Sequence, residues 1–484
     1  MNKSFLITCA SLFCFSCSVG TDYKQPMVYT NDQIVENLQL QSNSSMIISR
    51  EWYKSFNDPV LNYLINIGLE NSPNIKVALE KMHQARYNLF IDRSGFLPTL
   101  DAEGEYDKSN QNLAGIFPIK SEYYQIGVDA SWELDIWGGQ RRLTESAQAM
   151  LKSAAANLDN VKVSLVAEIA SQYVNWQLAQ MQLEITEKNL SLQRDIFDTV
   201  KDQYDAGLTD ELAFEQAKSV LHTTEMQIPQ LKIKEKSYKN ALAILIGKLP
   251  TDILKNKDNL VTKKYLFNKK QLYDLPVSVV RNRPDVQIVE QQLIAENALI
   301  GQAIANLFPS FTLSSFLGYQ NKNLSPILGP NYNMYTLGGT ITLPILHWGK
   351  LINKIKLQKS LTKQTLALYE ASLLTAITDI SNAIKSVEEE YKRNKSALSS
   401  MKAMSKILNL SKEKYDNGLI NFSDLATAEQ NKLSAEQEYL QSNANIYLNI
   451  ISFYKAIGGG LNFNHNSQAC QTDVITKECE LYKD

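Results

Sequence analysis

The stretch Tyr335-Thr-Leu-Gly-Gly-Thr-Ile-Thr-Leu-Pro-Ile345 decides the fold, together with the run 350–415 that follows it and contains neither proline nor glycine. In the first part, apolar residues alternate with threonine, which is the period of a β-strand with one apolar face. In the second part, Ile377, Ile380 and Ile384 recur at spacings of three and four, the pattern of a helix that packs lengthwise against other helices. At 1.5 Å per residue such a helix is roughly 100 Å long. The sequence therefore predicts a strand that leads directly into a helical rod.

The same strand-to-helix segment occurs twice in the chain. Trp348-Gly349 is matched by Trp137-Gly138, and the offset is 348 − 137 = 211 positions. The same offset relates Tyr415-Asp416-Asn417-Gly418 to Tyr204-Asp205-Ala206-Gly207, Asn282-Arg283-Pro284-Asp285 to Asn71-Ser72-Pro73-Asn74, and Ile457-Gly458 to Ile246-Gly247. One constant offset over so many landmarks predicts a tandem duplication.

The first 16 residues have the features of a secretory signal peptide, because Lys3 precedes an apolar run that is too short to span a membrane. Cleavage before Cys17 would expose an N-terminal cysteine, the residue that carries the acyl chains of bacterial lipoproteins, and we expect Cys17 to be lipidated. Cys14 stands three places before it, where leucine is usual, so a plain signal peptide with an incidental cysteine is the alternative. Beyond residue 17 no stretch approaches 18 consecutive apolar residues, so a membrane crossing would have to use strands.

Composition gives little support to an enzyme or a nucleic-acid-binding protein. The chain has 49 basic and 51 acidic residues, a net charge of −2, and no basic patch stands out. Its histidines are His83, His222, His347 and His465, none of which forms a pair at metal-ligand spacing. We expect no catalytic residues, no metal and no cofactor. Cys470 and Cys479 could form a disulfide in an oxidising periplasm.

The repeats and their boundaries give the expected domain organisation. It comprises a signal peptide (1–16), a lipidated arm and equatorial segment (17–72), repeat 1 (73–247), an equatorial linker (248–283), repeat 2 (284–458) and a C-terminal tail (459–484). Each repeat should contain a helix (73–94 and 284–306), a strand pair (99–106 with 122–136, and 310–319 with 332–345) and a long helical hairpin (138–246 and 349–457). Residues 18–50 lack periodicity and should form an extended arm.

The strand at 122–136 has an apolar face opposite a face with three carboxylates, Asp129, Glu133 and Asp135. This is the pattern of a barrel strand between lipid and water, although a half-buried strand of a soluble sheet alternates in the same way. The length of the strand favours the barrel. Four strands cannot close, and open edges in hydrocarbon cost several kcal/mol for each unpaired backbone group. We therefore expect three or more chains to build one barrel of 12 strands or more.

These stretches resemble the TolC-type outer-membrane factor family, and in particular its lipoprotein branch. The resemblance covers nearly the whole mature chain. It rests on Cys17 with Thr21-Asp22-Tyr23, on Trp52, Phe56, Asp58 and Leu61, on Glu133-Leu134-Asp135-Ile136-Trp137-Gly138, on Arg283-Pro284-Asp285 with Glu290, Gly301, Phe308 and Pro309, on Leu343-Pro344-Ile345, and on Ala456-Ile457-Gly458-Gly459-Gly460.

The resemblance implies a mostly α, α+β chain that forms a homotrimer. The trimer would have a 12-stranded β-barrel in the outer-membrane lipid, continuous with a periplasmic α-helical barrel, and an equatorial domain. It would be the passive duct of a tripartite efflux pump for drugs or other small toxic compounds. The other components would be a periplasmic adaptor protein and an inner-membrane transporter.

The two helical corners are the expected contact sites for the adaptor. The residues concerned are Gly207, Leu208, Thr209, Gly418, Leu419 and Ile420, although the same glycines could serve only as left-handed C-caps. Related channels often carry an aspartate ring near this corner, where this chain has Thr427 and the nearest carboxylate is Asp424. With Tyr415, these two are the candidate gate residues.

Two functions from other classes fit part of the sequence. A type I secretion channel would share the fold and export proteins, but the lipoprotein-like start and Arg283-Pro284-Asp285 favour the efflux branch. A surface coiled-coil protein would explain the rods, but it would not need an amphipathic strand before each of them.

Overall fold

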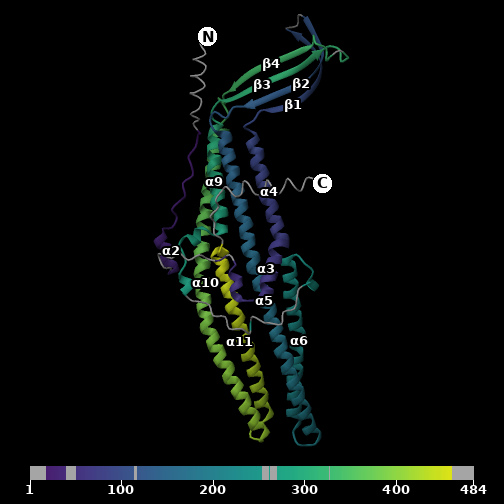
Figure 1. Ribbon diagram of the computed structural model, residues 1–484, viewed down its shortest axis with the longest axis vertical. Helices are drawn as coiled ribbons and strands as arrows, with labels where there is room; N and C mark the ends of the chain where they lie inside the picture. The colour runs from purple at the N-terminus through teal and green to yellow at the C-terminus, as the bar shows by residue number, and fades with distance from the viewer. Residues whose placement is uncertain are drawn as a thin grey trace. The chain divides into compact units, whose positions relative to one another are not determined.

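The computed structural model describes residues 18–39, 49, 51–113, 117–252, 261, 270–325 and 327–460 (Figure 1). The predicted signal peptide 1–16, Cys17, Cys470 and Cys479 lie outside the described residues. The chain divides into two compact units. The first comprises Met1–Met27, Glu80–Ala156 and Gln287–Ala371, and the second Val28–Leu79, Asn157–Val286 and Ser372–Asp484.

The elements follow the order expected for two repeats. They are α2 (Asn31–Leu38), η1 (Trp52–Phe56), α3 (Pro59–Asn71), α4 (Pro73–Ser94), β1 (Thr99–Leu113), β2 (Phe117–Glu133), α5 (Gly139–Asp205), α6 (Glu211–Ile246), η2 (Pro250–Asp252), α7 (Lys270–Tyr273), α8 (Ser278–Arg281), α9 (Pro284–Ala305), β3 (Ser310–Asn321), β4 (Asn333–Thr342), α10 (Lys350–Asp416), α11 (Phe422–Ala456) and η4 (Gly458–Gly460). Both bounds of α5 lie 211 residues before those of α10, and the same holds for α4 and α9. The prediction of a mostly helical chain with four strands is confirmed.

In the first unit the four strands form one antiparallel sheet in the order β1-β2-β3-β4 (Figure 1). The first hairpin is longer than predicted, because β1 continues to Leu113 and β2 begins at Phe117. Polar residues extend the pairing there: Lys108 lies opposite Glu122, and the two side chains form an ion pair of 3.2 Å.

The predicted ends of two strands, 136 and 345, are wrong. Strand β2 ends at Glu133 because the Asp135 carboxylate accepts hydrogen bonds from the backbone N–H groups of Gln140 and Arg141, each at 3.0 Å. Asp135 therefore caps the first turn of α5 instead of facing water on the sheet. Strand β4 ends at Thr342, two residues before Pro344, which has no backbone N–H for a sheet.

In the second unit the long helices form two hairpins, α5 with α6 and α10 with α11 (Figure 1). The helix pairs are joined by contacts such as the ion pair between Arg194 and Glu225 at 3.0 Å in the first hairpin and the hydrogen bond from Ser442 to Glu390 at 2.6 Å in the second. The predicted seam of α5 is buried at Val166, Ile169, Tyr173 and Trp176. In α10, Ile380, Ile384 and Val387 are buried, whereas Ile377 and Tyr391 are half-buried.

The N-terminal arm contains a helix that the sequence analysis missed. Helix α2 begins after Thr30, whose side chain accepts a hydrogen bond from the backbone N–H of Gln33, while the Gln33 side chain accepts one from the backbone N–H of Thr30. This reciprocal pair is a capping box. The spacing of threonine and glutamine three residues apart was a visible signal within a segment predicted to be extended.

The residues that precede α3 pack on two of the long helices in the second unit, α5 and α11. The Trp52 ring stacks on Tyr454 of α11 at 4.8 Å. Asp58 caps α3 through the backbone N–H groups of Val60 and Leu61, and its second oxygen accepts a hydrogen bond of 2.9 Å from the Tyr173 hydroxyl of α5. One buried carboxylate therefore both starts a helix and ties it to the rod.

The short helices continue the returning helices end to end. A Cβ atom added at Gly247, after α6, would lie 3.3 Å from Pro73 Cδ, and one at Gly458, after α11, would lie 3.4 Å from Pro284 Cδ. Both joints use a glycine with positive φ, 66° and 78° respectively. The pairs Gly247–Pro73 and Gly458–Pro284 are again related by the offset of 211.

Arg283 binds the second joint together. Its guanidinium donates to the carbonyl oxygen of Ala456 at the end of α11 (2.9 Å) and forms ion pairs with Asp285 (2.6 Å) and Asp379 (3.0 Å). The Asp285 carboxylate also accepts a hydrogen bond of 2.9 Å from the backbone N–H of Val286 at the start of α9. The buried Arg283 side chain therefore joins the end of one helix, the start of the next and the side of α10.

We predict that Arg283→Ala lowers the free energy of unfolding by about 3 kcal/mol, because it leaves two carboxylates and a helix end without their cation. Arg283→Lys should lower it less, since lysine keeps the charge and loses the forked geometry. Denaturant unfolding of the purified protein measures both. Arg93→Ala, which removes an exposed arginine at the end of α4, should stay within about 0.5 kcal/mol of the wild type. Equal stability of Arg283→Ala and Arg93→Ala would contradict the role of the joint.

Candidate functional sites

The sheet has one apolar face that nothing in the described chain covers. The register places Ala102, Val128, Leu317 and Tyr335 in one row across the four strands. Tyr335 is 81% exposed and Leu337, two residues further on, is 80% exposed. An uncovered apolar surface of this kind marks a contact with lipid or with another protein.

The opposite face is polar and acidic. Six carboxylates point to this side from the first two strands: Asp101, Glu103, Glu105, Asp107, Asp129 and Glu133. Strands β3 and β4 contribute mainly serine and threonine, and the strand positions on this face include no lysine or arginine. Only the carboxylates of 122–136 were predicted, although the alternation Asp-Ala-Glu-Gly-Glu-Tyr-Asp from Asp101 to Asp107 has the same pattern.

Within the described sheet, β1 and β4 each have a neighbour on one side only. Their outer edges expose backbone N–H and C=O groups, which need partners in a membrane. A sheet with an uncovered apolar face, an acidic face and two open edges is the architecture of a subunit of an outer-membrane channel.

The two helical corners of the second unit have the same geometry. At the first corner Gly207 has φ 73°, and its N–H and that of Leu208 donate to the carbonyl oxygens of Tyr204 and Gln203 at 2.9 and 2.7 Å. At the second corner Gly418 has φ 70°, with equivalent hydrogen bonds from Gly418 and Leu419 of 2.8 Å each. The predicted left-handed C-caps are therefore confirmed.

The predicted adaptor residues lie together at these corners. A Cβ atom at Gly207 or Gly418 would meet nothing within 4 Å, so only the backbone conformation requires glycine within this chain. Leu208 and Leu419 are both exposed, whereas Thr209 and Ile420 are half-buried. Each corner therefore presents one apolar side chain on a tight turn.

The candidate gate residues do not form one cluster. Asp424 is exposed in the first turn of α11, where its backbone N–H donates to the Asn421 side chain at 3.0 Å. Thr427 is exposed, and its hydroxyl donates to the carbonyl oxygen of Ser423 at 2.8 Å. Tyr415 packs instead on Phe422, with ring centroids 6.1 Å apart. Burial, and secondarily Asp416, raises the pKa of the Tyr415 hydroxyl.

Tyr415 belongs to an apolar cluster that connects the two hairpins near the corners. Its buried members are Val200, Ala217, Phe422 and Ala426, and Tyr415 packs against them with Ile196, Phe197, Ala213 and Val220. The cluster holds the start of α11 against α5 and α6. The sequence analysis missed it because apolar spacing along a helix does not identify the facing helix.

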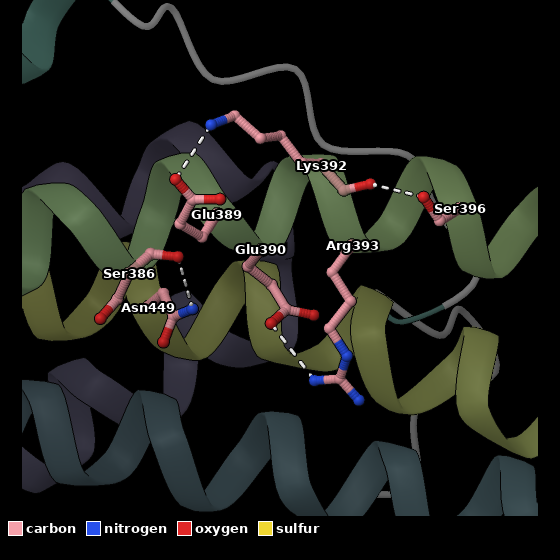
Figure 2. A pocket seen from close by; sticks show the side chains of 7 residues that line it. All are labelled: Ser386, Glu389, Glu390, Lys392, Arg393, Ser396 and Asn449. Carbon is pink, nitrogen blue, oxygen red and sulfur yellow. Dashed lines mark hydrogen bonds and ion pairs between the residues drawn. The ribbon is translucent and has the colours of Figure 1, made fainter.

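A hollow of about 510 Å³ lies along α10 and α11. Figure 2 shows the side chains that line it: Ser386, Glu389, Glu390, Lys392, Arg393, Ser396 and Asn449. Its charges are paired: Glu389 lies 2.8 Å from Lys385 and 2.9 Å from Lys392, and these two lysines lower the pKa of the Glu389 carboxyl to about 2. Arg393 forms ion pairs with Glu390 (3.4 Å) and Glu438. The charged side chains at the hollow therefore form a network of ion pairs that links α10 and α11.

Beneath this hollow lies a polar contact that repeat 1 lacks. The Ser442 hydroxyl, which is fully buried, donates to Glu390 at 2.6 Å, and Asn394 donates to Asn443 at 2.7 Å. The residues 211 positions earlier than Glu390 and Ser442 are Ala179 and Leu231, which are also buried. The two hairpins therefore consist of corresponding helices, but the buried side chains between those helices make different contacts.

Within the described residues, no group of three or more His, Cys, Asp or Glu side chains could hold a metal ion. None of the helices that the structure describes has the length and apolar character of a membrane span.

The comparisons with known proteins identify the family. The model of the outer membrane efflux protein family matches residues 64–248 and 275–459, so the chain belongs to this family. It is an outer-membrane channel protein for efflux, and the resemblance given by the motifs is confirmed.

Relatives and solved structures match over almost their whole length. The solvent efflux pump outer membrane protein SrpC of Pseudomonas putida is 27% identical over 473 residues, which covers 94% of this chain and 98% of SrpC. The cation efflux system protein CusC of Escherichia coli (strain K12) is 27% identical and covers 93% and 98% respectively. The structure of the outer-membrane channel OprN superposes with a TM-score of 0.82 at 27% identity, covering 92% of this chain and 99% of OprN. The Campylobacter jejuni CmeC channel gives 0.84 at 23% identity, which supports the fold, with coverage of 96% and 98%.

We predict that Ser442→Ala lowers the free energy of unfolding by about 2 kcal/mol, because the buried Glu390 carboxylate loses its short hydrogen bond. The double variant Glu390→Ala with Ser442→Leu reproduces the residues of repeat 1 and should recover that loss, since apolar replacements of buried charges are often neutral or stabilising. Denaturant unfolding of the purified variants measures both. Ser396→Ala is the control, because this exposed hydroxyl contacts only the carbonyl oxygen of Lys392 at 3.4 Å. A double variant less stable than Ser442→Ala would contradict this account.

Proposed function

We propose that the protein is the outer-membrane duct of a tripartite efflux pump and that it acts as a homotrimer. The observation that carries this proposal is the sheet with two open edges. Three copies of a four-stranded sheet supply 12 strands, and a closed barrel gives every edge strand a second neighbour. The helices of the three copies would form the periplasmic α-barrel, with the described residues before 73 and of the linker 248–283 in an equatorial belt.

The chemistry of the two sheet faces supports this placement. The row through Val128, Leu317 and Tyr335 would face the lipid of the outer membrane, where apolar side chains are stable. The six carboxylates of the other face would line the aqueous lumen, where water solvates their charges. The reverse arrangement would place six charges per chain in hydrocarbon.

The helical corners are the proposed contact with the periplasmic adaptor, which would connect the duct to an inner-membrane transporter. Gly207, Leu208 and Thr209 at one corner, and Gly418, Leu419 and Ile420 at the other, offer exposed leucines on turns without side chains at their apex. Asp424 and Thr427 remain the proposed gate, with Tyr415 holding the adjacent corner through its apolar contacts.

The lipid anchor at Cys17 is a proposal based on the sequence before it. The N-terminal segment supports it, because Ser18 lies beside Gly138 at the junction of β2 and α5, where a Cβ on the glycine would lie 2.9 Å from Ser18 Cα. An acyl chain on Cys17 would thus start next to the end of a strand that we place in the membrane. We assign the choice of exported compound to the transporter, because relatives named for solvents and for cations match 94% and 93% of this chain respectively.

We infer that the two halves arose by tandem duplication, with repeats at 73–247 and 284–458. The offset of 211 in the element bounds supports this. The two segments matched by the family model have the same offset, since 275 − 64 and 459 − 248 are both 211.

We predict that native mass spectrometry of the purified protein gives three times the mass of chain 17–484 plus the acyl groups on three N-terminal cysteines. Cys17→Ser should remove the acyl mass and leave the trimer, because the strands close the barrel. A stable monomer in detergent would overturn the proposed duct. An unmodified N-terminus in the wild type would overturn only the lipid anchor.

We predict that Gly418→Val abolishes drug resistance and adaptor binding while the trimer still forms. The valine side chain is strained at positive φ and projects into the contact surface. Gly418→Asn separates these causes, because asparagine tolerates the left-handed conformation. It should also abolish resistance if the adaptor covers the turn, and should be active if only backbone strain matters. Cross-linking to the adaptor and minimal inhibitory concentrations are the measurements. Wild-type resistance of both variants would contradict adaptor contact at this corner.

A further inference from the structure

The junction between the two repeats within one chain is fully formed in the first unit. Strand β2 pairs with β3 from Tyr124↔Asn321 to Glu133↔Thr312. At its end the Trp137 indole N–H donates to the carbonyl oxygen of Pro309 at 2.8 Å, and the ring stacks on Phe308 with centroids 4.8 Å apart. Strand β2 of repeat 1 therefore pairs with β3 of repeat 2, and Trp137 packs on the residues just before β3.

The corresponding groups beside the two outer strands of the sheet have no such partner within the described residues. Trp348 is the counterpart of Trp137 and is 89% exposed. Leu97 and Pro98 are the counterparts of Phe308 and Pro309, and Leu97 is exposed as well. One half of the junction thus lies at the end of β4 and the other half at the start of β1, each on an open sheet edge.

The N-terminal segment (residues 18–22) distinguishes the junction within the chain from the two half-junctions at the open sheet edges. Beside the junction within the chain, Gly20 packs on Gly301 of α9 so closely that a Cβ on Gly20 would lie 2.6 Å from Gly301 Cα. The Arg142 side chain holds this segment through Asp22 at 2.8 Å. At the counterpart of Gly301 stands Phe90, an exposed side chain on α4, and at that of Arg142 stands Asn353.

The difference between the two kinds of junction agrees with the presence of a single N-terminal segment in each chain. Each chain has one such segment, whereas a closed ring has one junction within each chain and one between successive chains. The segment packs over Gly301 at the first kind of junction. At the counterpart of Gly301, the exposed Phe90 carries a side chain where Gly301 has none.

We propose that successive copies join by a junction of the same register as the one within the chain. Adding 211 to each β2 residue and subtracting 211 from each β3 residue converts the pair Asp129↔Phe316 into Thr340 with Glu105 of the partner subunit. The pair Ser131↔Ser314 becomes Thr342 with Glu103 of the partner subunit. The Trp348 indole N–H then donates to the carbonyl oxygen of Pro98 of the partner subunit. The proposal rests on the homotrimer proposed above and specifies which residues meet in it.

The faces of the two strands agree with this register. Odd-numbered residues of β4, such as Ile341, lie on the apolar face, and they meet even-numbered residues of β1, such as Gly104, on the same face. A shift of the register by one residue would place the threonines of β4 beside the apolar residues of β1. A shift by two would keep the faces and move Trp348 away from Pro98, so the register needs a direct test.

The test is disulfide cross-linking in isolated outer membranes, with the full chain carrying Cys470→Ser and Cys479→Ser. Thr340→Cys with Glu105→Cys should give covalent dimers and trimers on non-reducing gels after copper-phenanthroline oxidation, because directly opposite residues come within disulfide reach. Thr340→Cys with Glu103→Cys, and Thr340→Cys with Asp107→Cys, are the matched controls on the same face. They shift the register by two residues either way to about 7–8 Å, and should give at least about tenfold less product.

The possible outcomes test the proposed strand register and the proposed oligomeric state separately. Product confined to the Glu105 pair supports the proposal. Product mainly in either control, or no product from any pair in a protein that native mass spectrometry shows to be a trimer, would overturn the register and leave the trimer intact. A monomeric mass would overturn the register together with the proposed duct.

Discussion

The need to pair every backbone N–H and C=O group in a membrane is the constraint on which the rest of this structure depends. Four strands satisfy it everywhere except along the outer edges of β1 and β4. No side chain of the same sheet can satisfy a whole edge, so another strand must do so. Association, the apolar face and the acidic face are therefore linked: closing the edges also separates lipid from water. Helices of this length could fold without such a sheet. The sheet could not line a pore in lipid while its two outer edges stayed unpaired.

The helical part meets a different requirement, because helices of unequal length are joined in each repeat. Helices α5 and α10 have 67 residues each, whereas the returning helices α6 and α11 have 36 and 35. The chain makes up the difference by placing α4 and α9 at the ends of the returning helices. A helix end exposes carbonyl groups and the next helix start exposes N–H groups, so each joint must satisfy both. Arg283 and Asp285 do so with side chains of opposite charge, which explains physically why Arg-Pro-Asp occurs at this point.

The sequence predicted the long elements well because proline and glycine positions and apolar periodicity define them locally. Prolines at 73 and 284 and glycines at 207 and 418 mark helix ends through their own backbone preferences. The errors arose where a side chain hydrogen-bonds to the backbone a few residues away and changes the local structure. Asp135 alternates like a strand residue but is taken by the first turn of α5, and Thr30 and Gln33 form a capping box inside a segment that looks irregular. The cluster of Val200 and Phe422 could not be predicted, because no local pattern states which helices face each other.

The differences between the repeats are as informative as their common offset. A duplicated chain begins with two equivalent halves, and each half then meets different neighbours. Gly301 accommodates the N-terminal segment where repeat 1 has an exposed Phe90, and Glu390 with Ser442 bonds one hairpin where Ala179 and Leu231 fill the other. Despite these substitutions, the bounds of α4 and α9, and of α5 and α10, still differ by 211. The offset therefore sets the architecture, while the positions at which the repeats diverge identify the contacts that only one half makes.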